Sequence, residues 1–99
     1  MIARIWHGKT KVSDANAYLE YLFKSGIPAY RATPGNKGAW VLRRTESDVA
    51  HFITLSFWES HDAIVTFAGP DPEAAKYYAE DEKYLLEFEP TVTHYELFQ

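Results

Sequence analysis

The run over residues 49–58 constrains the fold of this chain more than any other part of the sequence. Alternation along a strand places Ile53 and Phe57 on one face of a sheet. The same alternation places Phe52 and Trp58 on the opposite face. Because large apolar patches are rare on the surfaces of monomers, both faces of this sheet need a cover.

Three further segments have the pattern of strands. The run over 2–11 alternates and predicts a first strand, and the run over 91–98 predicts a last one. The run over 38–45 is separated from 49–58 by three polar residues, Glu46-Ser47-Asp48. Two strand-like runs joined by so short a link predict a β-hairpin.

Helices are expected in the two gaps between these strands. Ser13 is a residue type that often caps a helix, so a first helix is predicted after it, ending near Gly26. A second helix is predicted to begin after Ser60 and to end at Gly69. A weaker helical pattern covers 72–88.

The order strand–helix–strand–strand–helix–strand predicts a ferredoxin-like α+β fold. Its four-stranded antiparallel sheet has the strand order 4-1-3-2, and both helices cover one face. We expect residues 1–99 to form one domain. The simplest cover for the other face is the same sheet of a second copy, so a homodimer in the form of a dimeric α+β barrel is predicted.

Composition excludes several classes of protein. No cysteine is present, which excludes disulfides and Cys-ligated metal sites. The net charge of −4 argues against a nucleic-acid partner. No apolar run approaches the roughly 18 residues of a membrane span, so no membrane partner is expected and the cytoplasm is the predicted location.

Four short segments carry a resemblance to a known family: residues 1–8 (MIARIWHG), 57–60 (FWES), 67–69 (FAG) and 93–96 (THYE). Together they resemble the antibiotic biosynthesis monooxygenase family of the dimeric α+β barrel superfamily. The resemblance implies a homodimer with a pocket between helices and sheet in each subunit. It also implies oxidation of electron-rich aromatic or quinol-like compounds by molecular oxygen, without flavin, metal or haem.

Other members of that family degrade haem, and their pattern can be compared residue by residue. Their tryptophan matches Trp58, but Lys76 stands where the resemblance would place the axial histidine. Their first-strand asparagine falls near Trp6 or His7, and neither is asparagine. Because a protonated lysine has no lone pair for iron, haem degradation is disfavoured at this stage.

Oxygenation without a cofactor needs a base that works near neutral pH, and histidine is the side chain whose pKa suits this role. His7 and His94 are the candidate catalytic bases, and they are predicted to cluster with His51 at one sheet edge. The alternatives are ordinary hydrogen-bonded histidines at strand ends and a three-histidine metal site. Trp58 is a third catalytic candidate, either as a stacking wall for a planar substrate or as a packing residue.

Five residues are candidates for substrate binding. The aromatic candidates would form walls or a cover over the pocket, although packing is the alternative for each of them. Arg44 would hold an anionic substrate or form an interface salt bridge. The complete set is Trp6, Arg44, Phe67, Tyr78 and Tyr84.

The predicted function is therefore a cofactor-independent monooxygenase for a planar, hydrophobic, quinol- or anthrone-like small molecule. A non-catalytic homodimer that binds or senses such a molecule is the first alternative. A purely structural dimerisation module is the second.

Overall fold

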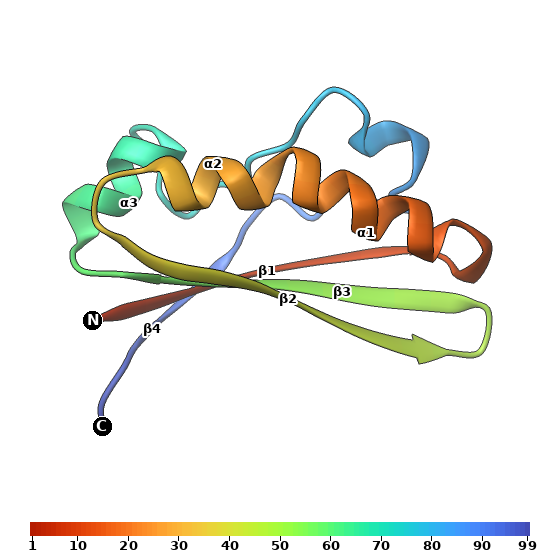
Figure 1. The fold of residues 1–99 in the computed structure, drawn as a ribbon, viewed down its shortest axis with the longest axis horizontal. Helices are drawn as coiled ribbons and strands as arrows, with labels where there is room; N and C mark the ends of the chain where they lie inside the picture. Colours follow the sequence, from red (N-terminus) through yellow and green to blue (C-terminus); the bar gives the residue numbers. More distant parts are fainter.

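The sheet is built around its two central strands, β1 and β3, in the computed structural model, which describes residues 1–99. Its order is β2-β3-β1-β4, and every neighbouring pair is antiparallel. This is the predicted order 4-1-3-2, so the ferredoxin-like α+β fold is confirmed (Figure 1). The strands are β1 (Ile2–Lys11), β2 (Asn36–Glu46), β3 (Val49–Trp58) and β4 (Thr93–Glu96).

All helices lie on one side of this sheet (Figure 1). The predicted first helix is divided at Ser25, whose φ of −122° and ψ of −86° depart from helical values. Ser60 is confirmed as a cap because its Oγ accepts a hydrogen bond of 3.2 Å from the backbone N–H of Ala63. The helices are α1 (Ala15–Lys24), α2 (Gly26–Ala32) and α3 (His61–Ala68), with 3-10 turns η1 (Val12–Asp14) and η2 (Asp81–Lys83).

Ser13 does not cap the first helix, which corrects that prediction. It lies inside η1, and α1 begins after Asp14 without a side-chain cap. The 3-10 turn brings the chain from β1 into the helix. The backbone N–H of Val12, at its start, donates instead to the carbonyl of Asp48 in the hairpin turn.

Residues 70–92, which we call the connecting segment, do not form the helix predicted over 72–88. Local backbone hydrogen bonds form only short turns such as η2, and other backbone groups of the segment bond to distant partners. The N–H of Leu86 donates to the carbonyl of Lys9 in β1, at 2.9 Å. Within the segment, Ala75 N–H donates to Pro90 and Val92 N–H donates to Glu73, both at 2.9 Å. These tertiary bonds outweigh a weak helical propensity.

The hydrophobic core lies between the helices and one face of the sheet, which we call the covered face. Phe52 and Trp58 of β3 lie there with Tyr18 and Ile64, all of them fully buried or nearly so. The opposite face, the open face, has no helix over it (Figure 1). Its large side chains Trp40, Leu42 and Tyr95 are 50%, 51% and 57% exposed. Both faces therefore carry bulky apolar groups, as the alternation predicts.

No helix of the structure is long and apolar enough to cross a membrane.

Candidate functional site

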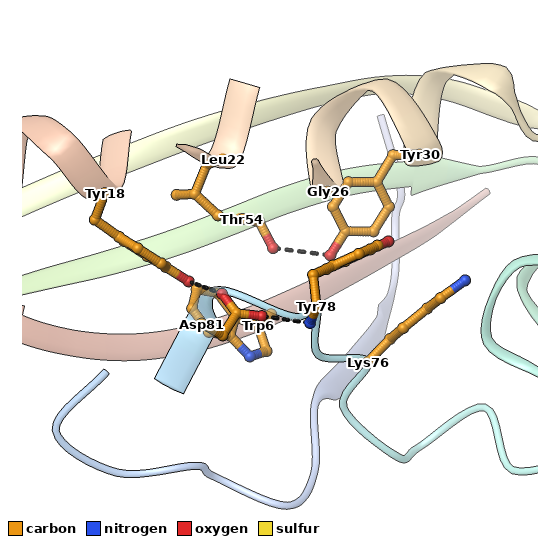
Figure 2. Close-up of a pocket in the computed structure, with 9 residues that line it drawn as sticks. All are labelled: Trp6, Tyr18, Leu22, Gly26, Tyr30, Thr54, Lys76, Tyr78 and Asp81. Carbon is orange, nitrogen blue, oxygen red and sulfur yellow. Dashed lines mark hydrogen bonds between the residues drawn. The ribbon is translucent and has the colours of Figure 1, made fainter. Parts of the chain in front are cut away.

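A narrow pocket with a cavity volume of about 20 Å³ lies between the covered face, the helices α1 and α2, and the connecting segment (Figure 2). The two helices contribute one wall, β1 and β3 contribute the floor, and the connecting segment closes the remaining side. Its lining residues are Trp6, Tyr18, Leu22, Gly26, Tyr30, Thr54, Lys76, Tyr78 and Asp81.

Trp6 forms the aromatic floor of the pocket. It reaches the covered face because even-numbered positions of β1 point that way, and its indole lies 6.5 Å from the ring of Tyr18. Its Nε1 donates a 3.4 Å hydrogen bond to the hydroxyl of Tyr77. The indole also occupies the space beside Gly8, where an added Cβ would be only 2.3 Å from Trp6 Cη2. The absence of a side chain at Gly8 therefore leaves room for the indole of Trp6.

Asp81 fastens the connecting segment to the pocket wall. Its side chain is 3% exposed. One carboxylate oxygen accepts from the Tyr18 hydroxyl at 3.0 Å and the other from the backbone N–H of Tyr78 at 2.6 Å (Figure 2). Burial raises the pKa of Asp81 above its ordinary value. Burial, followed by the nearby carboxylate of Asp81, raises the pKa of Tyr18, so this phenol stays neutral and donates.

Two further tyrosines bring hydroxyl groups to the pocket. The hydroxyl of Tyr30 lies 3.0 Å from Thr54 Oγ1, so one of the two donates to the other. The hydroxyl of Tyr78 is buried and has no hydrogen-bond partner. Burial raises the pKa of Tyr78 to about 12, and its phenol is therefore neutral at physiological pH. Since buried polar groups are normally paired, this hydroxyl is free to bond a ligand.

The structure brings only two of the predicted binding residues, Trp6 and Tyr78, to the pocket lining. Trp58 and Phe67 lie behind it: Trp58 is fully buried and donates from Nε1 to Ser56 Oγ at 2.9 Å. Phe67 stacks on Tyr30, with 4.6 Å between ring centroids. Tyr84 is not among the lining residues and packs against Tyr18.

His7 lies on the open face, away from this pocket. Its Nε2 lies 3.0 Å from His51 Nδ1, and its Nδ1 lies 2.5 Å from a carboxylate oxygen of Glu89. A second hollow, with a cavity volume of about 200 Å³, includes both histidines and Arg44, which pairs with Glu46 at 3.1 Å. His7 and Arg44 therefore belong to a different surface from Trp6, because neighbouring strand positions face opposite sides.

His94 does not join His7 and His51, so the predicted cluster of three histidines is wrong. Its cross-strand partner is Arg4, which lies on the covered face. The pairing of β4 with β1 places His94 opposite Arg4, three residues from His7 along β1, and an odd separation puts two residues on opposite faces. Burial, followed by the charge of Arg4, lowers the pKa of His94.

Seven of the nine lining residues were not among the predicted site residues: Tyr18, Leu22, Gly26, Tyr30, Thr54, Lys76 and Asp81. Tyr18 belongs to the apolar stripe of the first helix, and Thr54 shares its strand face with Phe52. Those two periodicities are signals that could have found them. Asp81 gives no such signal, because its position depends on long-range bonds within an irregular segment.

No protein-family model and no curated protein matches this chain. Among solved structures, the chain is similar to the heme-degrader MhuD from Mycobacterium tuberculosis with two hemes bound in its active site. The identity is 20%, the TM-score is 0.63, and the match covers 100% of this chain and 97% of that one. A mutant of MhuD with two manganese protoporphyrin IX molecules per active site matches with 20% identity and a TM-score of 0.64, over 100% and 96% of the two chains.

This comparison corrects the predicted function. The prediction of a cofactor-independent monooxygenase for a quinol- or anthrone-like substrate, which disfavoured haem degradation, is wrong: the solved structures reported above are those of a heme-degrader. They lend no support to the non-catalytic alternative either. Lys76 lies in the irregular connecting segment, where spacing along the sequence does not determine where a side chain lies. What the comparison establishes for this chain is the fold, shared along its whole length.

Proposed function

We propose that this chain binds a porphyrin in the pocket between sheet and helices, with haem as a substrate for oxidative breakdown. The observation that carries the proposal is the unpaired, buried hydroxyl of Tyr78 in an aromatic pocket. The supporting comparison is the fold, which is that of porphyrin-bound structures over the whole chain. On the same grounds we propose membership of the antibiotic biosynthesis monooxygenase family.

The residues of the pocket suit a porphyrin in three respects. Trp6 and Tyr18 offer flat apolar surface for a macrocycle. Lys76 offers an ammonium for an acidic side group, and the neutral hydroxyl of Tyr78 offers a hydrogen-bond donor for the same group. No histidine lines the pocket.

Bound haem would supply the iron that activates oxygen together with the macrocycle that is oxidised. The chain's own residues hold and enclose it. The cavity volume of about 20 Å³ is far below that of typical ligand pockets, which run from about 300 to 1,000 Å³. Binding of a porphyrin therefore requires the connecting segment to move outward from the helices.

Titration with haemin tests the proposal. We expect a shifted Soret band that saturates at one stoichiometric ratio, and loss of this band when a reductant and oxygen are added. Tyr78→Phe should weaken binding by about tenfold, the effect of one hydrogen bond to a charged group. Tyr95→Phe, on the open face, is the matched control. The absence of saturable binding by the wild-type chain would reject the proposal.

We further propose that the chain works as a homodimer through its open face. The half-exposed side chains of Trp40, Leu42 and Tyr95 support this, because they form apolar surface that a second sheet would cover. Leu42→Arg should then convert a dimer to a monomer in analytical ultracentrifugation. Phe23→Arg, which alters a similarly exposed residue of α1, should not. A monomeric wild-type chain would contradict the proposal. The cytoplasmic location stays a prediction.

A further inference from the structure

Arg4 is the most deeply buried charged residue of the chain, at 1% exposure. Its Nη1 donates to the hydroxyl of Tyr30 at 3.4 Å and its Nη2 to the carbonyl of Ala74 at 3.1 Å. Its Nε has no partner, and no carboxylate forms an ion pair with it. Burying a charge without an opposite charge is costly, so Arg4 carries an electrostatic penalty in the free chain.

The unpaired polar atoms of the interior gather around this arginine. Three buried side-chain atoms lack a hydrogen-bond partner: Arg4 Nε, the Tyr78 hydroxyl and His94 Nε2. His94 is the cross-strand partner of Arg4. Tyr78 and His94 are both close enough for the charge of Arg4 to act on their pKa values, although burial has the larger effect on each. One region of the core therefore holds all the unmet hydrogen bonds of the buried side chains.

A second cation lies at the same place. Lys76 Nζ is 4.7 Å from the ring centroid of Phe67, and the guanidinium carbon of Arg4 is 5.3 Å from that centroid. Lys76 donates to the carbonyl of Phe67 at 3.2 Å and forms no ion pair. The carboxylate of Asp81 is already bonded to Tyr18 and to the backbone of Tyr78. Two positive charges thus flank one ring without a negative partner.

We propose that the pocket binds an anionic oxygen of its ligand, a carboxylate or a phenolate, at the end formed by Tyr30, Tyr78 and Lys76. Tyr78 donates a hydrogen bond and Lys76 pairs directly with the anion. Arg4 acts from behind Tyr30, which accepts its hydrogen bond and lines the pocket. The anion supplies the negative charge that these two cations lack. In Figure 2, the ends of Tyr78 and Lys76 point toward the same side of the pocket.

This inference rests on the proposed function only in placing the ligand in the same pocket, and it specifies in addition that the ligand is anionic. Two pairs of probes separate porphyrin binding from binding of an anion. One pair is protoporphyrin IX and its neutral dimethyl ester; the other is 1-naphthoate and its neutral methyl ester. Binding is measured by quenching of tryptophan fluorescence, since Trp6 lines the pocket.

We expect wild type to prefer the acid over the ester by about tenfold or more in at least one pair, the size of a hydrogen bond to a charged group. Arg4→Met and Lys76→Met should each reduce this preference several-fold, whereas Arg4→Lys should retain most of it. Arg43→Met is the matched control, because Arg43 is exposed and bonds Asn16. If Arg4→Met does not fold, Lys76→Met, at an exposed position, decides.

Each result decides the question. An acid preference with naphthoate that depends on Arg4 or Lys76, without porphyrin binding, supports the anion site and rejects the porphyrin. Equal affinity for acid and ester, or a preference unchanged in both Met variants, overturns the anion site while porphyrin binding stands. No binding of any probe overturns both.

Discussion

The hydroxyl of Tyr18 donates a 3.0 Å hydrogen bond to the carboxylate of Asp81, across 63 residues of sequence. This contact joins α1 to the connecting segment at the edge of the pocket. The other carboxylate oxygen accepts from the backbone N–H of Tyr78, the residue whose own hydroxyl is unpaired. The buried carboxylate of Asp81 therefore holds the backbone of the connecting segment against α1.

Removal of the Tyr18 hydroxyl should destabilise the chain. Tyr18→Phe leaves a buried oxygen of Asp81 without its donor, and we expect the free energy of unfolding to fall by about 1–3 kcal/mol. Urea denaturation measures the change. Tyr95→Phe, whose ring is 57% exposed, is the control and should have little effect. Equal stability of Tyr18→Phe and wild type would show that the contact does not hold the segment.

Two glycines near the pocket should respond in opposite ways to alanine. At Gly26, an added Cβ would meet Tyr78 at 3.7 Å, an ordinary contact within α2. Gly26→Ala should therefore raise the free energy of unfolding by about 0.4–1 kcal/mol, by restricting the unfolded chain. Gly8→Ala should lower it by about 1–3 kcal/mol, because the new methyl would collide with the Trp6 indole. Thermal or urea unfolding of the pair checks both signs.

Neighbouring residues of β1 should differ in their effect on haemin binding. Trp6→Leu removes the aromatic floor of the pocket, and we expect binding to weaken by about three- to tenfold, the contribution of one aromatic contact. His7→Ala changes the opposite face and should leave the affinity within about twofold. Soret titration of both variants measures this. A larger loss in His7→Ala would move the ligand site to the open face.

His94 should make stability depend on pH just below neutrality. Burial lowers its pKa below 6.5, so the unfolded chain takes up a proton first as the pH falls. The free energy of unfolding should therefore decrease as the pH drops below about 6.5 toward the folded-state pKa. His94→Gln should remove this part of the decrease, and His61→Gln, at the exposed start of α3, should leave most of it, because the charge of His61 contributes least to the lowered pKa of His94. Urea unfolding at a series of pH values measures the effect.

The fold could be predicted because its strands follow local patterns. Alternation over 49–58 sets which side chains enter the core, and the observed β3 (Val49–Trp58) has these bounds. The division of the first helix at Ser25 was harder to predict from the sequence. Gly26 signals a break, but α2 resumes at once because Ile27 and Tyr30 are buried under it.

The site was harder to predict because the connecting segment, which forms part of it, has no regular helical or strand periodicity. Asp81 and Tyr78 reach the pocket through bonds to distant residues, which sequence spacing does not specify. The sequence does contain a signal for Arg4, because it lies between Ile2 and Trp6 on one face of an alternating strand. A charged residue at a core position of such a strand indicates a special role, although the pattern does not say which one.

The two backbone bonds that tie Ala75 to Pro90 and Glu73 to Val92 bring the ends of the connecting segment together. The stretch between them is an Ω-loop, a compact excursion that leaves and returns to nearly the same point. Its length and composition can change without altering the register of any strand. The dimensions of the cavity can therefore vary among related chains while the sheet stays the same.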